Sequence, residues 1–130
     1  MKAWLIEGFT GIDKLRLADV ADPVPAAGEV LLRVTFAALN PADRYLAQGE
    51  YPAKPPLPHI LGRDGSGTVV ATGPGVEGHP VGQQRAILRG ELGVTRWGTF
   101  AQLVATPAES LIELPAGWTN ARQAAHHWST

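Results

Sequence analysis

The stretch VLLRVTFAALNPADRYLAQGEYP, Val30 to Pro52, decides the fold because a long strand runs directly into a polar segment. Glu29 to Leu39 is apolar and rich in β-formers, which predicts the longest strand of the chain. A short helix is predicted over Ala42 to Ala47, with Asn40 as its cap and Pro41 at its first position. Hydrogen-bonding side chains therefore gather at the point where this strand stops.

The rest of the chain has the pattern of an all-β domain. The sequence contains 15 glycines and 11 prolines, dispersed between short apolar runs, which indicates many corners. The proline-rich segment Gly49–Ile60 is predicted to be an extended loop throughout. A helix start is predicted over Thr119–His127. Six more strands are predicted, over Lys2–Glu7, Leu15–Val20, Thr68–Thr72, Arg85–Leu88, Gly98–Pro107 and Ser110–Pro115. Seven short strands with little helix favour a β-barrel or a β-sandwich.

Composition excludes several classes of protein. The chain has 130 residues, 45% hydrophobic and 18% charged, which suits one folded domain and argues against disorder. A net charge of −1 favours neither nucleic acid nor an anionic membrane surface as a partner. The sequence has no apolar run of spanning length and no signal-peptide pattern at its start, so we expect a cytoplasmic protein. Cysteine is absent, which excludes disulfides, thiol nucleophiles and cysteine-ligated zinc.

The polar segment after the long strand allows a structural and a functional interpretation. Asn40 could be an ordinary helix cap, Asp43 could bind a first-turn N–H group, and Tyr45 could be a half-buried aromatic residue. Alternatively, an Asn amide and a Tyr hydroxyl offer donors and acceptors that could hold a ligand's carboxamide or polarise a carbonyl oxygen. The residue types alone favour the structural interpretation.

Four collinear stretches carry a resemblance to a known family. They are VLLRVTFAALNPADRYLAQGEYP, LPHILGRDGSGTVVATGPGV, WGTFAQLVATPAESLIELPAGW and ARQAA, which together cover nearly the whole chain. The sequence resembles the N-terminal domain of the medium-chain dehydrogenase/reductase superfamily, closest to its zinc-free, quinone-oxidoreductase-like branch. The resemblance implies a mainly β fold, a GroES-like and partly open β-barrel with short helices.

The resemblance also implies a function and a set of site residues. It implies an NAD(P)H-dependent, zinc-independent oxidoreductase of the quinone reductase or alcohol dehydrogenase type, with NADPH as the expected cofactor and a small carbonyl compound or quinone as substrate. Asn40 and Tyr45 fall where the family contacts cofactor or substrate; both are expected to bind cofactor, and Tyr45 is the expected catalytic residue. Tyr51 is expected to contact substrate. With the resemblance, the functional interpretation is favoured for Asn40 and Tyr45, whereas Asp43 stays a structural residue.

The nucleotide-binding half of the family has no counterpart in the sequence. A Gly-x-Gly-x-x-Gly turn should lie between a strand and a helix, but GRDGSG, Gly62 to Gly67, precedes a strand. These glycines are better explained as places where backbone passes close to backbone. We expect a GroES-like domain over 1–118, followed at 119–130 by the truncated start of the inter-domain helix. Without a Rossmann domain, the isolated chain should have little or no catalytic activity.

A catalytic zinc is not expected. Zinc-dependent relatives place a cysteine and a Gly-His-Glu sequence where this chain has Asn40 and Gly62-Arg63-Asp64, and the guanidinium of Arg63 cannot bind a metal ion. One alternative remains, a site built from oxygen and nitrogen ligands on Asp43, His59 and Asp64. His59 itself is expected to be exposed or to cap the core from the proline-rich loop.

Two functions without chemistry are alternatives. A barrel without its partner domain would expose an apolar face, so the chain could be a binding module that self-associates, with Trp97, Trp118 and Trp128 as candidate contact residues. A role like that of a chaperonin cap would follow from the shape of the fold alone, which is a weak basis for function.

Overall fold

The fold is described by a computed structural model, which covers residues 1–52, 54–88 and 91–114. The predicted helix start at Thr119–His127, the predicted domain boundary after residue 118, and two of the three tryptophans proposed as contact residues lie outside the described residues.

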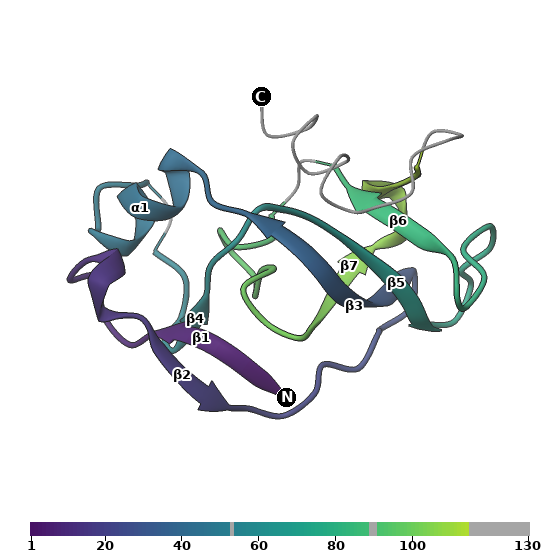
Figure 1. The fold of residues 1–130 in the computed structure, drawn as a ribbon, viewed down its shortest axis with the longest axis horizontal. Helices are drawn as coiled ribbons and strands as arrows, with labels where there is room; N and C mark the ends of the chain where they lie inside the picture. Colours follow the sequence, from purple (N-terminus) through teal and green to yellow (C-terminus); the bar gives the residue numbers. More distant parts are fainter. Residues whose placement is uncertain (53, 89–90, 115–130) are drawn as a thin grey trace.

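The described residues form a mainly β fold with one α-helix and two sheets (Figure 1). Strand order is β2-β1-β4 in the smaller sheet and β7-β3-β5-β6-β8 in the larger one, and every pairing is antiparallel. The sheets do not close, as predicted for a partly open barrel. The elements are β1 (Lys2–Ile6), η1 (Ile12–Lys14), β2 (Arg16–Asp19), β3 (Glu29–Ala38), α1 (Pro41–Ala47), β4 (His59–Ile60), β5 (Asp64–Thr72), β6 (Gln84–Ile87), β7 (Leu103–Pro107), η2 (Ala108–Ser110) and β8 (Leu111–Glu113).

The long strand β3 organises the larger sheet, because β5 pairs along one of its edges and β7 along the other. The glycine-rich sequence before Thr68 belongs to β5 itself, which begins at Asp64, four residues earlier than predicted. A Cβ atom added to Gly67 would lie 2.2 Å from the carbonyl oxygen of Arg33 on β3. The prediction that these glycines permit close backbone contact is therefore confirmed.

The prediction of a continuous loop over Gly49–Ile60 is wrong at its end, because His59 and Ile60 form strand β4. Leu5 pairs with Ile60, and β1 thereby reaches β4. His59 is buried, and its Nε2 lies 2.9 Å from the carbonyl oxygen of Gly93. Burial lowers the pKa of His59, since removing the ring from water disfavours its charged form.

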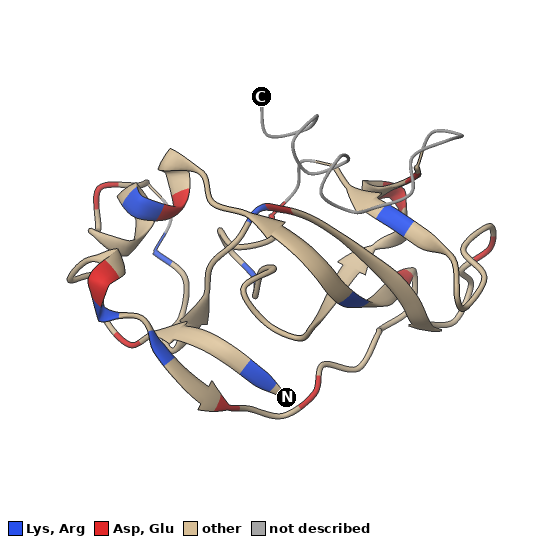
Figure 2. Cartoon of the chain, viewed as in Figure 1, with Lys and Arg blue, Asp and Glu red and all other residues tan. Residues whose placement is uncertain are grey.

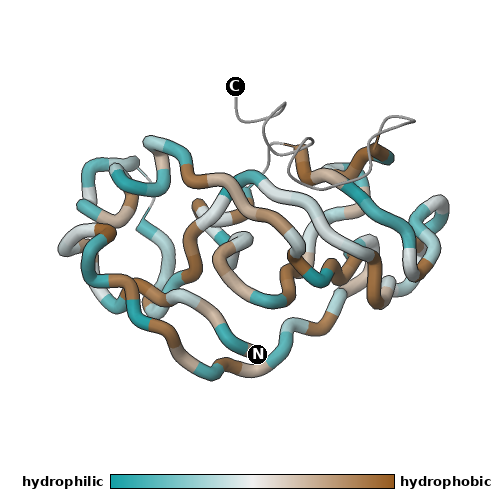
Figure 3. The backbone as a smooth tube through the Cα atoms, in the orientation of Figure 1, coloured by the Kyte–Doolittle hydropathy of each residue, from teal (hydrophilic) through white to brown (hydrophobic). Residues whose placement is uncertain are grey.

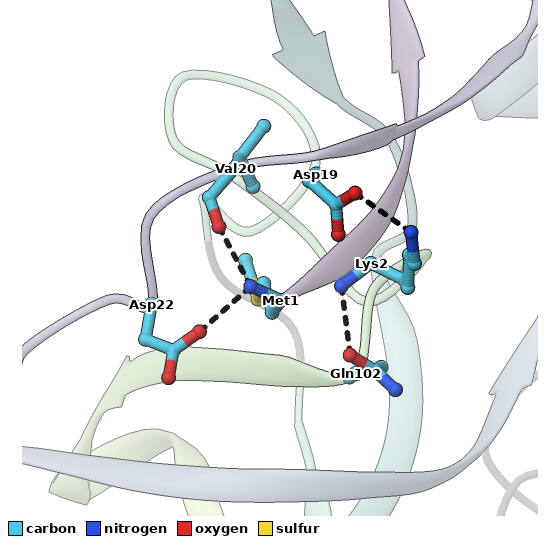
Figure 4. A network of polar contacts seen from close by, with 6 residues as sticks. All are labelled: Met1, Lys2, Asp19, Val20, Asp22 and Gln102. Atoms are coloured by element: carbon cyan, nitrogen blue, oxygen red, sulfur yellow. Dashed lines mark hydrogen bonds and ion pairs between the residues drawn. The ribbon is translucent and has the colours of Figure 1, made fainter.

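A connecting segment, residues 98–102, joins the two sheets. Gly98 donates a backbone hydrogen bond to β4, and Phe100 and Gln102 exchange backbone hydrogen bonds with β1. The side chain of Gln102 also accepts a hydrogen bond from the N–H of Lys2, as Figure 4 shows beside the Lys2–Asp19 ion pair. Because Gln102 accepts a backbone hydrogen bond from Val34 of β3, the segment contacts both sheets.

The core of the described residues is divided among clusters of apolar side chains on both sheets and on α1. Figure 3 shows apolar positions distributed along the backbone. The largest cluster lies on the larger sheet and includes Val30, Leu32, Val69 and Val104. Charged residues of both signs are interspersed along the described ribbon, as Figure 2 shows. No helix in the described ranges has the length and hydropathy required to span a bilayer.

Candidate functional site

The site begins where β3 ends and α1 starts, at Asn40. Asn40 has extended backbone and serves as the N-cap of α1, and Pro41 occupies the first helical position, both as predicted. The carboxylate of Asp43 accepts a hydrogen bond from the N–H of Asn40 at 2.9 Å. Asn40 and Asp43 form a capping box, in which the Asn40 side chain faces the N–H of Asp43 while the Asp43 carboxylate binds the N–H of Asn40. The amide nitrogen of Asn40 remains available for another partner.

The Asn40 side chain turns to Asp64, the first residue of β5. Ala38 at the end of β3 pairs with Asp64, and this register brings the carboxylate beside the N-cap. Asn40 Nδ2 donates to Asp64 Oδ2 at 2.7 Å. An ionised carboxylate can only accept hydrogen bonds, so it must face the NH₂ end of the amide. The side-chain oxygen of Asn40 is thereby the end that points away from Asp64.

Asp43 holds the turn before β5 against α1. Its side chain is 1% exposed, and its second oxygen accepts a hydrogen bond from the N–H of Gly62 at 3.1 Å. Burial raises the pKa of Asp43, although hydrogen bonds from the backbone of Asn40 and Gly62 oppose the change. The structural role predicted for Asp43 agrees with these contacts.

Thr99 of the connecting segment binds the backbone on which Arg63 and Asp64 are placed. Thr99 is buried, its N–H donates to the carbonyl oxygen of Gly62, and its hydroxyl donates to the carbonyl oxygen of Asp64 at 3.0 Å. Gly62 has a φ of 108°, and a Cβ atom there would lie 2.2 Å from the Thr99 hydroxyl. Only glycine can both adopt this positive φ and leave space for the Thr99 side chain, so packing against Thr99 requires glycine at this position.

The two tyrosines lie differently from Asn40. Tyr45 lies on α1 and is 47% exposed. Its hydroxyl makes no hydrogen bond to any residue that the structure describes. Tyr51 is half-buried in the loop after α1, and its hydroxyl accepts a long contact of 3.4 Å from Arg63 Nη1. We call Asn40, Asp43, Tyr51, Arg63 and Asp64 the strand-end cluster.

The structure thus joins Asn40 to Asp43 and Asp64, and Tyr51 to Arg63, but it does not join Tyr45 to either pair. Sequence reasoning considered Arg63 and Asp64 as residues in place of zinc ligands, and Asp64 also as a ligand of the alternative metal site. Their partnership with Tyr51 and Asn40 depends on the pairing of β3 with β5. The available signal for these partnerships was the sequence Gly62-Arg63-Asp64, which places two charged residues shortly before the predicted strand.

Among the described residues, no group of three or more His, Cys, Asp or Glu side chains is placed so that it could bind a metal ion. The alternative trio is not formed, since His59 lies on β4 and contacts Gly93 instead. A separate small pocket of about 130 Å³ lies outside the strand-end cluster, and its lining residues are Met1, Pro23, Arg96, Trp97, Leu103, Val104 and Ala105.

Comparison with known proteins identifies the family. Residues 26–116 match the family model described as the alcohol dehydrogenase GroES-like domain. The chain belongs to this family. The predicted relation to the medium-chain dehydrogenase/reductase superfamily is therefore confirmed.

The relatives with similar sequences include a protein named as a synaptic vesicle membrane protein homolog and proteins named as oxidoreductases. The synaptic vesicle membrane protein VAT-1 homolog-like of Mus musculus is 33% identical over 88% of this chain and 26% of its own length. The quinone oxidoreductase of Lama guanicoe is 39% identical over 56% of this chain and 22% of its own length. The chain spans about a quarter of the length of these curated relatives.

Solved structures agree on the fold. An alcohol dehydrogenase superfamily protein from Novosphingobium aromaticivorans has a TM-score of 0.85 and 41% identity, over 96% of this chain and 37% of that protein. A quinone oxidoreductase from Pseudomonas syringae has a TM-score of 0.83 and 30% identity, over 95% of this chain and 36% of that protein.

Proposed function

We propose that this chain forms the substrate-side wall of an NAD(P)H-dependent, zinc-independent oxidoreductase that reduces small carbonyl compounds or quinones. Several relatives are named as oxidoreductases, including the quinone oxidoreductase of Lama guanicoe. Hydride transfer is the chemistry of the nicotinamide when it is bound, and the protein contributes binding, orientation and electrostatics. A chain of this kind needs few reactive groups, but the groups that contact the cofactor must be held in one orientation.

The orientation of the Asn40 amide is the observation that supports this function best. Asp64 holds the amide by its nitrogen, at 2.7 Å, so the amide oxygen is the end presented away from β5. That oxygen faces the N–H of Asp43 in the capping box, and its second lone pair is an acceptor that can bind the N–H of a carboxamide, the group that nicotinamide carries. Asn40 would therefore orient the nicotinamide ring by its carboxamide.

The tyrosines take the remaining roles in this proposal. Tyr45 carries an exposed phenol that could contact the cofactor and donate a hydrogen bond to the carbonyl oxygen, where negative charge develops during reduction. Tyr51 would contact the substrate from the loop after α1. NADPH is the proposed cofactor.

The test is a titration of the isotope-labelled chain with NADPH, followed by nuclear magnetic resonance. We expect changes in the backbone amide signals around Asn40 and Tyr45, with weak binding because a nucleotide domain would supply most of the contacts. Asn40→Ala should reduce these changes several-fold. Gln48→Ala is the control, because Gln48 is exposed at the other end of the same helix. Absence of changes around Asn40, or equal changes in both variants, would contradict the proposal.

The activity of the chain alone is measured separately. With NADPH and a benzoquinone, we expect no loss of nicotinamide absorbance beyond the rate without protein. Clear turnover would show that the 130-residue chain is a complete catalyst, contrary to the proposal.

One observation favours the alternative, a self-associating module without chemistry. Trp4 and Leu17 are directly paired on β1 and β2, and they are 46% and 50% exposed. Trp97, proposed earlier as a contact residue, instead donates its indole N–H to the carbonyl oxygen of Pro58. Sedimentation at several concentrations distinguishes the alternatives: a concentration-dependent dimer that Trp4→Lys abolishes would support self-association, and a monomer at all concentrations would exclude it.

A further inference from the structure

Arg63 is the cation of the strand-end cluster, and it has no carboxylate partner among the described residues. Two other arginines differ in this respect: the partly buried Arg96 pairs with Glu29 at 2.6 Å, and the buried Arg85 lies 3.7 Å from Glu113. Arg63 is likewise partly buried, but its one hydrogen bond is the 3.4 Å contact to the Tyr51 hydroxyl. Most of its five N–H donors are therefore uncommitted within the described structure.

The two neighbouring carboxylates each bind a partner other than Arg63. Both oxygens of Asp43 accept backbone N–H groups, from Asn40 and Gly62. Asp64 binds the Asn40 amide through Oδ2. These acids reduce the positive potential near Arg63 without filling its hydrogen-bonding positions, so the guanidinium remains able to bind an added anion.

A guanidinium whose N–H donors are largely without partners selects ligands by charge and by shape. Its planar fork of donors matches a carboxylate, which it can bind through two parallel hydrogen bonds. Partial burial strengthens such a pair, because fewer water molecules compete for the donors and the effective dielectric constant is lower than in water. The Tyr51 hydroxyl accepts a hydrogen bond from Arg63, and its own hydrogen adds one further donor beside the guanidinium.

We infer that Arg63, assisted by Tyr51, binds a carboxylate group on the substrate, so that this protein acts on small carbonyl compounds that carry an acidic group. The inference rests on the proposed function, because it names the substrate class of the same site. Arg63 directly precedes Asp64, which binds Asn40, and its guanidinium contacts Tyr51, so the anion would be held at the same turn as the group proposed to contact the nicotinamide. The carboxylate would then anchor the substrate while its carbonyl faces the cofactor.

The test compares two ligands that differ in charge and by one methyl group. The labelled chain is titrated with 4-oxopentanoate and with methyl 4-oxopentanoate at pH 7, and the amide signals of Gly62, Arg63 and Asp64 are followed. We expect the acid to bind at least about tenfold more tightly than the ester, as a single charge-assisted contact would give. Inorganic phosphate is titrated in parallel, because a phosphate group could fill the same donors.

Variants at Arg63 assign the preference to the guanidinium. Arg63→Gln should abolish the difference between acid and ester, and Arg63→Lys should retain part of it, since an ammonium keeps the charge and loses the fork. Arg33→Gln is the matched control, because Arg33 is exposed on β3 and remote from the cluster along the strand. It should leave the preference unchanged.

Each other outcome contradicts the inference. Equal binding of acid and ester, no binding of either, or a preference that survives in Arg63→Gln would exclude a carboxylate site at Arg63. Phosphate binding that is tighter than acid binding would assign the donors to a phosphate instead.

The readouts separate this inference from the proposed function. Shifts at Asn40 and Tyr45 with NADPH, without an acid preference, would retain the oxidoreductase and exclude the acidic substrate. An acid preference without NADPH shifts would retain the anion site and exclude the cofactor role.

Discussion

At the scale of single residues, the strand-end cluster depends on which polar atoms are already satisfied. Asp43 is buried with both oxygens occupied, so it stabilises the turn and is poorly placed for chemistry. Asn40 donates through its amide nitrogen to Asp64, and its side chain also faces the N–H of Asp43 in the first turn of α1. Two side chains of similar size therefore have different roles, which follow from their partners.

Replacing Asp43 tests its role as a buried acceptor. Asp43→Ala leaves the N–H groups of Asn40 and Gly62 without their side-chain acceptor, so we expect a loss of about 2–4 kcal/mol in the free energy of unfolding. Asp43→Asn keeps one acceptor and should lose less. Urea unfolding measures both values, and Glu77→Ala, at an exposed residue, should change stability by no more than about 0.5 kcal/mol. A loss below about 1 kcal/mol in Asp43→Ala would contradict the role described.

At the scale of elements, close contact between β3 and β5 determines where the cluster forms. The two strands lie side by side along their length (Figure 1), and the register that pairs Ala38 with Asp64 brings the start of β5 to the end of β3. The pairing shifts between Val34 and Phe36, beside the position where Gly67 faces β3. Glycine on β5 therefore allows the approach on which the site depends.

Gly67→Ala tests this approach. The added Cβ would lie 2.2 Å from the carbonyl oxygen of Arg33, and backbone on both strands would have to move. We expect a loss of about 3 kcal/mol, at the upper end for an overpacked site, and displaced amide signals at Asn40 and Asp64. Gly8→Ala is the control, since the nearest atom to its added Cβ is 3.9 Å away. Equal stabilities of the two variants would show that the strands are less closely packed than described.

At the scale of the whole molecule, the connecting segment holds the two sheets together and also supports the cluster. Its residues contact β1, β4 and, through Val34, the larger sheet. Thr99 in this segment contacts the backbone of both Gly62 and Asp64. The assembly of the two sheets and the geometry of the site are therefore linked through one short stretch of chain.

Thr99→Val tests this link, because it removes one buried hydroxyl with little change in volume. The carbonyl oxygen of Asp64 loses its hydrogen bond, so we expect a loss of about 1–2 kcal/mol and faster hydrogen exchange at the start of β5. The same substitution at the exposed Thr72 should change stability by less than about 0.5 kcal/mol. Unchanged exchange at β5 in Thr99→Val would show that the segment does not support the site.

Sequence patterns that act over a few residues were sufficient for much of this protein. The apolar run of β3, the Asn-Pro start of α1, the glycines of β5 and the absence of cysteine each report local chemistry, so they predicted a mainly β domain and the place where polar groups gather. Strand β4 was missed because it is only two residues long and follows a run of prolines, and its place in the sheet comes from its pairing with β1. The partnerships of Asn40 with Asp64, and of Tyr51 with Arg63, join residues 24 and 12 positions apart. Such contacts were decided by the tertiary structure, because they depend on strand register and on packing beneath the turn, which no local pattern encodes.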